Sequence, residues 1–176
     1  MHAFVTVGTT KFEALIEALD TDACLSALVA RGFNSLRLQI GHGDHIPRMS
    51  FPGLELSYYR HDPQYKQDVN RADLIISHAG AGSIMDALAL KKTLVVVVNT
   101  QLMDNHQTEL AEAMAEQNYC LQTSVQGLED VLETGDWSNL QPYPQPHEQA
   151  FPDLVDTVMG LVEDPKQHVD GINNIQ

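Results

Sequence analysis

Short apolar runs alternate along the chain with stretches in which apolar residues recur every three or four positions. The runs predict buried strands, and the helical spacing predicts amphipathic helices. The predicted strands cover residues 3–7, 35–40, 54–58, 74–76, 94–98 and 119–122. The predicted helices cover residues 12–19, 22–30, 62–71, 83–90, 104–117 and 125–132. This alternation indicates an α/β domain built on a Rossmann-like, doubly wound, mainly parallel sheet.

The pattern changes in the C-terminal part of the chain. We assign residues 1–134 to the Rossmann-like domain, and residues 135–149 to a proline-rich connector. Residues 150–163 have the spacing of an amphipathic helix, which either folds back on the domain or binds a partner. We expect residues 164–176 to form a flexible tail.

Charge and composition narrow the classes of protein. The chain has 176 residues, of which 10 are Lys or Arg and 24 are Asp or Glu, giving a net charge of −14. This charge argues against a nucleic-acid partner and against direct docking on an anionic membrane. It leaves room for a small anionic ligand, because helix ends and loop amides bind phosphate even in acidic proteins.

The sequence also predicts the cellular compartment of the protein and whether it binds a metal. No apolar run approaches the length of a membrane span, and the N-terminus has no signal-peptide pattern, so we expect a cytoplasmic protein without a direct membrane span. Cys24 and Cys120 are too few for a disulfide framework and lie in apolar runs, which indicates buried free thiols in a reducing compartment. The eight His residues are scattered without metal-ligand spacing, so we expect no metal site.

The segment with the most chemical information is residues 72–86, where a buried strand runs into small residues and a helix begins. Gly80 and Gly82 permit a tight turn and a close approach of a ligand to the backbone. Free amides at the start of the helix favour an anion, with phosphate the usual one. His78 can donate to a phosphate oxygen, Ser83 adds a hydroxyl, and Asp86 can accept from a sugar hydroxyl.

A purely structural interpretation of these residues is open as well. Ser83 and Asp86 have the S-x-x-D spacing of a helix capping box, and a single His after a strand is often a structural residue. The first strand ends in Gly8-Thr9-Thr10, without the G-x-G-x-x-G of a dinucleotide fold, which argues against a dehydrogenase.

Two further loops follow predicted strands and could line the same crevice. In residues 102–107, Asp104 could be a helix N-cap, but Asn105, His106 and Gln107 add more hydrogen-bonding groups than a cap needs. Thr9 and Thr10 could cap the helix over residues 12–19 or face a sugar or diphosphate.

Together these motifs resemble a known family. Residues 77–83 (SHAGAGS) and 102–107 (LMDNHQ), with 5–12 (VTVGTTKF) and 38–41 (LQIG), resemble the catalytic subunit of the two-chain transferase that adds the second N-acetylglucosamine to the dolichol-diphosphate-linked oligosaccharide. The similarity covers about residues 3–132, and residues 43–67 do not follow the pattern. Related enzymes are bacterial peptidoglycan-precursor N-acetylglucosaminyltransferases, whose GT-B fold has two Rossmann-like halves. The resemblance implies that this chain is the C-terminal, donor-binding half.

The resemblance also implies roles for individual residues. The family's diphosphate-contacting loop matches His78, Gly80, Ala81, Gly82 and Ser83, and its ribose contact matches Asp86. The turn that contacts the sugar and the diphosphate matches Asn105, His106 and Gln107. The loop after the first strand matches Thr9 and Thr10 more loosely. The donor would be UDP-N-acetylglucosamine, with no cofactor and no metal.

The implied activity is an inverting transfer of N-acetylglucosamine to GlcNAc-diphosphodolichol, giving GlcNAc2-diphosphodolichol, in N-linked glycosylation. Because 176 residues supply one half of a GT-B enzyme, we expect a membrane-anchored, acceptor-binding partner subunit. That partner would supply the general base and recruit the chain to the cytosolic face of the endoplasmic reticulum. A non-catalytic UDP-sugar-binding regulatory module and a free-standing nucleotide-sugar epimerase or hydrolase are the alternatives.

Overall fold

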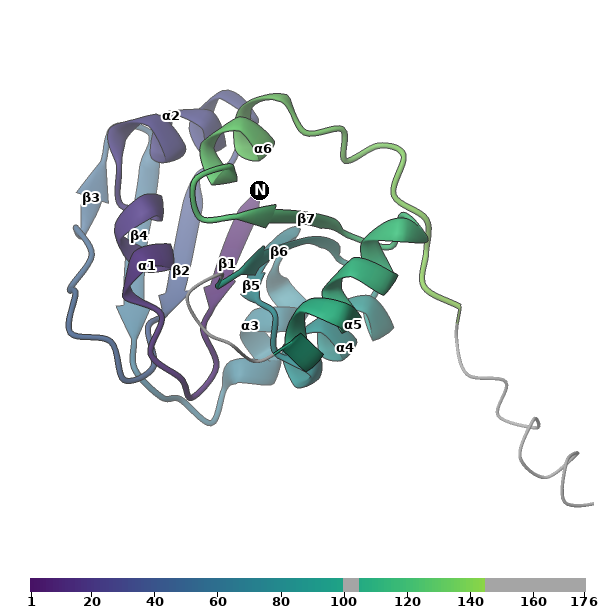
Figure 1. The fold of residues 1–176 in the computed structure, drawn as a ribbon. Coiled ribbons are helices and arrows are strands. Elements are labelled where there is room, and N and C mark those ends of the chain that lie inside the picture. The colour runs from purple at the N-terminus through teal and green to yellow at the C-terminus, as the bar shows by residue number, and fades with distance from the viewer. Residues whose placement is uncertain (100–104, 145–176) are drawn as a thin grey trace, which may run out of the picture. The chain divides into compact units, whose positions relative to one another are not determined.

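A seven-stranded sheet runs through the part of the chain that the computed structural model describes, residues 1–99 and 105–144 (Figure 1). The strands are β1 His2–Thr6, β2 Ser35–Gln39, β3 Ser50–Phe51, β4 Leu54–Tyr59, β5 Leu74–His78, β6 Thr93–Val98 and β7 Leu121–Ser124. The helices are α1 Glu13–Leu19, α2 Asp22–Ala30, α3 Tyr65–Arg71, α4 Ala81–Ala89, α5 Asn105–Glu116 and α6 Leu128–Thr134. None of the described helices is long and apolar enough to cross a membrane.

The order of the strands places a crevice in the middle of the sheet. The order is β3-β4-β2-β1-β5-β6-β7, and all neighbours pair in parallel except β3 with β4. Strands β2, β4 and β3 therefore lie on one side of β1, and β5, β6 and β7, which follow α3 in the chain, lie on the other side. The direction of winding reverses between β1 and β5, which form a topological switch point. In register, Thr6 of β1 lies beside Gln39 of β2 and Ser77 of β5, so the three strands end at the same edge.

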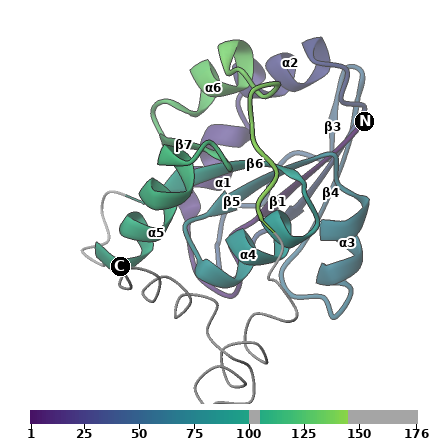
Figure 2. The ribbon, with the colours of Figure 1, turned by 90° about the vertical axis from the view of Figure 1, so that its right-hand side faces the viewer.

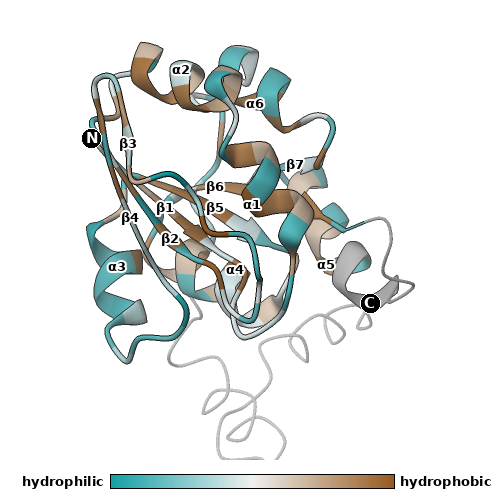
Figure 3. Ribbon diagram, turned by 90° about the vertical axis from the view of Figure 1, so that its left-hand side faces the viewer, coloured by the Kyte–Doolittle hydropathy of each residue, from teal (hydrophilic) through white to brown (hydrophobic). Residues whose placement is uncertain are grey.

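Helices cover both faces of the sheet, which explains the nearly continuous apolar runs of its central strands. Helices α1, α2 and α6 lie on one face, and α3, α4 and α5 on the other (Figure 2). Alternate residues of one strand enter different cores: Val95 and Val97 of β6 pack with α1, α2 and α6, whereas Val96 packs with α4 and α5. In Figure 3 the central strands are correspondingly hydrophobic along their length.

The fold class predicted from the sequence is confirmed, with local corrections; among them, α3 and α6 each begin three residues later than predicted. The short antiparallel edge strand β3 was not predicted, because its 2 residues carry no periodicity. The predicted loop over residues 77–82 is only Ala79 and Gly80, since β5 extends to His78 and α4 begins at Ala81. Strand β7 begins and ends two residues later than predicted.

Residues 135–143 of the predicted connector pack on the domain. The Trp137 ring lies edge-on to Phe33 at 5.9 Å between centroids, and the Arg31 guanidinium lies over the Trp137 ring at 3.9 Å. Tyr143 similarly contacts Tyr119, at 5.2 Å between ring centroids. The predicted helix over residues 150–163 and the tail over 164–176 lie outside the described residues.

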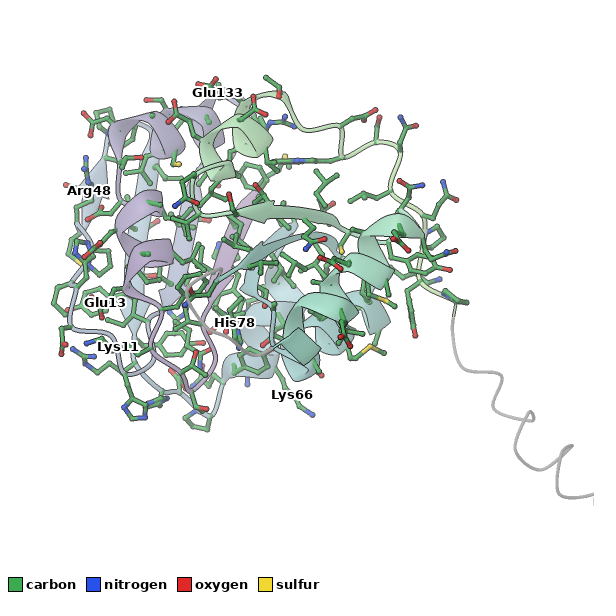
Figure 4. The ribbon with its side chains drawn as sticks, in the orientation of Figure 1. Lys11, Glu13, Arg48, Lys66, His78 and Glu133 are labelled. Atoms are coloured by element: carbon green, nitrogen blue, oxygen red, sulfur yellow. The ribbon has the colours of Figure 1, made fainter. Side chains whose placement is uncertain are left out.

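Carboxylates of α1 and its C-terminal end hold the segment between β2 and β3, on the left in Figure 4. Glu13 accepts hydrogen bonds from the backbone N–H groups of Asp44 at 2.5 Å and His45 at 2.9 Å. Asp20 accepts from Arg48 Nε at 2.9 Å and from the Arg48 backbone N–H at 3.2 Å, and it also contacts His45 Nε2 at 3.1 Å. These bonds tie the segment to α1 through its backbone and side chains.

We expect Asp20→Ala to lower the free energy of unfolding by about 1–3 kcal/mol, because it removes an acceptor shared by several donors. Urea unfolding followed by circular dichroism measures this loss. Asp22→Ala is the matched control: the Asp22 side chain is 80% exposed and pairs with Arg48 Nη1, whereas the Asp20 side chain is 12% exposed. An equal loss in both variants would show that Asp20 contributes only a surface ion pair.

Candidate ligand-binding cleft

A cleft of about 440 Å³ lies at the carboxyl ends of β1, β2 and β5. Its volume is in the range of small-molecule binding sites, and its position at the switch point is where doubly wound sheets bind ligands. The residues that line it are Gly8, Thr9, Thr10, Gln39, Tyr65, His78, Gly80, Gly82, Ser83 and Asp86.

The structure brings most of the sequence-predicted site residues to this cleft. The predicted residues that line it are Thr9, Thr10, His78, Gly80, Gly82, Ser83 and Asp86. Ala81 is the first residue of α4 and is not among the lining residues. Asn105, His106 and Gln107 begin α5, and their side chains are outside what the structure describes, as is Asp104.

Helix α4 begins at the cleft without a side-chain cap. Its N-cap residue is Gly80, and the first helical hydrogen bond runs from the Ile84 N–H to the Gly80 carbonyl. The capping-box interpretation is therefore wrong, since Ser83 is the third residue of the helix and is not its N-cap. The first N–H groups of a helix have no partner within it, and no side chain among the described residues caps those of α4. Gly82 and Ser83 line the cleft, so this end of α4 faces the space a ligand would occupy.

Two of the glycines make room for the imidazole ring of His78. Gly8 has a φ of +62°, and a Cβ there would lie 2.9 Å from His78 Cε1. A Cβ on Gly80 would collide with His78 Nε2. Gly82 differs, because a Cβ there would meet no atom of the described residues within 4 Å apart from its chain neighbours and the backbone of its own helix. Gly8 and Gly80 thus serve packing, whereas Gly82 leaves open space at the helix end.

The hydrogen bond of His78 decides which of its two ring nitrogens carries the proton. His78, at the end of β5 (Figure 4), is 9% exposed, and its Nδ1 lies 3.3 Å from the Thr6 carbonyl oxygen. A carbonyl only accepts, so Nδ1 carries the proton and Nε2 of the neutral ring has a lone pair. Burial lowers the pKa of His78, and the bond to Thr6 opposes this only in part. The predicted donation to a phosphate oxygen therefore requires a second proton, on Nε2.

The loop after β1 is held by its own hydroxyl groups. Thr10 Oγ1 donates to the Val7 carbonyl at 2.7 Å, and the N-cap residue of α1 is Phe12, without a side-chain cap bond. The alternative that Thr9 or Thr10 caps α1 is therefore wrong. Thr6 Oγ1 accepts from the Gly8 N–H at 3.0 Å and donates to Gln39 Oε1 at 2.5 Å.

Two lining residues were missed by the sequence analysis. Gln39 ends β2, is 6% exposed and accepts from Thr6; its signal was a polar residue at the end of a buried strand. Tyr65 begins α3, and no pattern in its segment pointed to the cleft. Within the described residues, no group of three or more His, Cys, Asp or Glu side chains could hold a metal ion.

The fold and cleft define a doubly wound α/β domain with an open helix N-terminus at its switch point, an arrangement suited to an anionic ligand. Comparison with known families assigns the domain further. The chain belongs to the family described as the glycosyltransferase family 28 C-terminal domain, whose model matches residues 2–158.

Individual relatives agree with this assignment. The chain is 44% identical over 119 residues to the UDP-N-acetylglucosamine transferase subunit ALG13 of Mus musculus, a match that covers 67% of this chain and 10% of that protein. The protein of the same name from Cryptococcus neoformans is 30% identical over 190 residues, a match that covers 89% of this chain and 95% of that protein. The chain therefore spans about a tenth of the mouse relative and nearly all of the fungal one.

Solved structures show the same fold. An NMR solution structure of ALG13 superposes with a TM-score of 0.64 at 29% identity, covering 87% of this chain and 94% of that one. The crystal structure of Acinetobacter baumannii MurG superposes with a TM-score of 0.62 at 17% identity, covering 90% of this chain and 49% of that one. The second similarity concerns the fold alone.

We expect Gly80→Ala to lower the free energy of unfolding by about 1–3 kcal/mol, because its methyl group overlaps the buried His78 ring. Gly82→Ala is the control, and it should leave stability unchanged or raise it by up to about 1 kcal/mol, as Gly-to-Ala changes in helices do. Thermal unfolding of both variants measures the difference. A destabilised Gly82→Ala with an unaffected Gly80→Ala would contradict the packing described for His78.

We expect His78 to make the protein less stable as the pH falls below 6.5. The unfolded ring takes up a proton near its ordinary pKa of 6.5, whereas the folded ring, with its lowered pKa, does so only at lower pH. The slope from one such group is at most about 1.4 kcal/mol per pH unit. Denaturant unfolding between pH 7.5 and 5 should therefore show a shallower dependence for His78→Gln than for the wild type. Parallel curves would show that the folded ring titrates normally.

Proposed function

We propose that this chain is the donor-binding subunit of an inverting glycosyltransferase of N-linked glycosylation. It transfers N-acetylglucosamine from UDP-N-acetylglucosamine to GlcNAc-diphosphodolichol, giving GlcNAc2-diphosphodolichol. It acts with a membrane-anchored subunit that binds the lipid-linked acceptor, in the cytoplasm at the cytosolic face of the endoplasmic reticulum. Family membership and the names of the relatives support the reaction class and the donor.

The observation that carries the proposal is the uncapped N-terminus of α4 at the cleft. The partial positive charge of a helix N-terminus and its free N–H groups bind phosphate well. The helix has 9 residues, enough for an aligned set of peptide dipoles. In this position it would hold the diphosphate of the donor and stabilise the charge that develops on the leaving UDP.

Other residues of the cleft would bind the rest of the donor. His78 would donate from Nε2 to a diphosphate oxygen after protonation, which the negative charge of the ligand favours. Asp86 would accept hydrogen bonds from the ribose, and Thr9 and Thr10 would offer hydroxyl groups. By the family resemblance alone, Asn105, His106 and Gln107 would contact the sugar and diphosphate.

The reaction would be a single displacement at the anomeric carbon. The acceptor hydroxyl oxygen forms a bond to that carbon from the side opposite UDP, while the bond from the carbon to the diphosphate oxygen breaks. The electron pair of that bond leaves with UDP, and the acceptor proton passes to a general base on the partner subunit. The α4 N–H groups would stabilise the leaving diphosphate most strongly in the transition state. Because helix and imidazolium supply positive charge, the proposed reaction uses no metal ion or cofactor.

Two comparisons support the proposal of a partner subunit. The ALG13 proteins are named as transferase subunits, and the MurG similarity places this fold in 49% of a longer enzyme chain. An acceptor-binding half would then face the carboxyl edge of the sheet, where the cleft opens. The recruitment of this chain to the membrane would depend on that subunit.

We expect Gly82→Ala to lower kcat/KM for transfer at least tenfold in the enzyme assembled from this chain and its membrane subunit. The added methyl group would project into open space where Gly82 lines the cleft, without meeting a neighbouring side chain of the described residues. Transfer from radiolabelled UDP-N-acetylglucosamine to GlcNAc-diphosphodolichol measures the effect. Ala89→Gly, at the far end of α4, is a matched control that should retain full activity after correction for stability.

The same assay separates the proposed function from its alternatives. A regulatory module would bind UDP-N-acetylglucosamine, but transfer would persist at full rate with Gly82→Ala. A free-standing epimerase or hydrolase would turn over the donor without the second subunit. Either result would contradict the assignment of this chain as a donor-binding catalytic subunit.

A further inference from the structure

Gln39 presents an amide group to the cleft from the end of β2. Its side chain lines the cleft, although the residue is only 6% exposed. In register it lies beside Thr6 of β1, and Thr6 Oγ1 donates to Gln39 Oε1 at 2.5 Å. The same hydroxyl oxygen accepts from the Gly8 N–H at 3.0 Å. One hydroxyl group therefore joins the two strand ends and the loop after β1.

The Thr6 hydroxyl fixes which end of the amide faces the ligand. Thr6 is fully buried, and Gln39 Oε1 is the acceptor of its proton. Turning the amide over would place Nε2 against Thr6 and leave the Thr6 proton without an acceptor among the described residues. A buried donor without a partner is costly, so the amide keeps Oε1 toward Thr6.

Gln39 Nε2 therefore faces the cleft as a donor. It forms no hydrogen bond with the described part of the chain. The described side-chain atoms that are enclosed without a partner are Tyr59 Oη and Trp137 Nε1, so Nε2 is not enclosed and keeps contact with solvent through the cleft. An amide NH2 group only donates, so this point of the cleft favours a ligand atom that accepts.

The position of Gln39 favours a neutral acceptor. Gln39 ends β2, two strands away from β5, whose end leads into α4. Neighbouring strands lie about 4.8 Å apart, so the ends of β2 and β5 are about 10 Å apart across the sheet. Among the described residues that line the cleft, none is Lys or Arg. A carbonyl oxygen therefore fits this donor better than the diphosphate, which would lie at the N-terminus of α4.

We propose that Gln39 binds a carbonyl oxygen of the ligand through Nε2, and that Thr6 is the positioning residue that orients the amide. This inference rests on the proposed function, because it takes the ligand to be UDP-N-acetylglucosamine. That ligand carries neutral carbonyl groups in its uracil ring and in its acetamido group, and both match the donor. A purely structural Gln39 would only join β2 to β1.

NMR titration of the full chain with UDP-N-acetylglucosamine, UDP and uridine tests the contact. Gln39→Met keeps an unbranched side chain and removes the amide. We expect it to bind UDP-N-acetylglucosamine about three- to tenfold more weakly, the usual effect of one lost hydrogen bond. Equal weakening of all three ligands would locate the carbonyl in the uracil ring, and weakening of UDP-N-acetylglucosamine alone would locate it in the acetamido group. Gln122→Met, in β7 and outside the cleft lining, is the matched control and should change no affinity.

Two variants of Thr6 test its positioning role. Thr6→Val removes the hydroxyl, whereas Thr6→Ser keeps it. We expect Thr6→Val to weaken the same ligands as Gln39→Met does, and Thr6→Ser to bind them as the wild type does. Adding Thr6→Val to Gln39→Met should then cause little further loss. Binding by Thr6→Ser that is as weak as by Thr6→Val, or additive losses in the double variant, would overturn the role of Thr6.

The same titrations separate this inference from the proposed function. Unchanged affinities in Gln39→Met, or an equal loss in Gln122→Met, would overturn the inference and leave the proposed function standing. Weaker binding of UDP with uridine unaffected would also overturn it, because the contact would then be with the diphosphate. If the wild type binds none of the three ligands, the proposed function fails, and this inference fails with it.

Discussion

The hydrogen bond between His78 and the Thr6 carbonyl organises the cleft. It joins the carboxyl ends of β5 and β1, the two strands at which the winding of the sheet reverses. The imidazole ring fills the space between them only because Gly8 and Gly80 have no side chain. Gly80 is also the N-cap residue of α4, so the glycine that accommodates the ring also leaves this helix end without a side-chain cap. The packing of His78 and the uncapped helix end therefore depend on the same residue.

The groups that line the cleft would affect the binding of a charged ligand more than the net charge of −14 does. Exposed charges are screened over about 8–10 Å at physiological ionic strength, whereas helix N–H groups act at hydrogen-bond distance. Among the described residues, the carboxylate that lines the cleft is Asp86, on the second turn of α4. A diphosphate at α4 and a neutral diol at Asp86 would thus occupy separate parts of one cleft. This division suits a nucleotide better than a simple anion.

The sequence predicted the sheet well, because buried central strands carry long apolar runs such as residues 94–98. It missed β3, whose 2 residues pair only because β4 folds back beside them. The S-x-x-D spacing of Ser83 and Asp86 left a capping box open as an alternative to ligand binding, since the same spacing also occurs within the first turns of a helix. Gln39 and Tyr65 reach the cleft from separate elements; a polar residue at the end of a buried strand was the one sign of Gln39, and no local pattern pointed to Tyr65. The tautomer of His78 depends on the Thr6 carbonyl, which lies 72 residues away in the sequence. Only the tertiary structure brings the two groups together.

The central claim is that the N-terminus of α4 binds the diphosphate of a nucleotide, and amide chemical shifts in the ¹⁵N-labelled chain test it most directly. Titration with UDP should shift the amide resonances of Gly82 and Ser83 more than those at the other end of the helix, such as Leu88. Uridine, which has no phosphate, should leave the Gly82 and Ser83 amides nearly unchanged. If UDP binds without moving these resonances, or if uridine moves them equally, the helix end does not hold the diphosphate and the account is wrong.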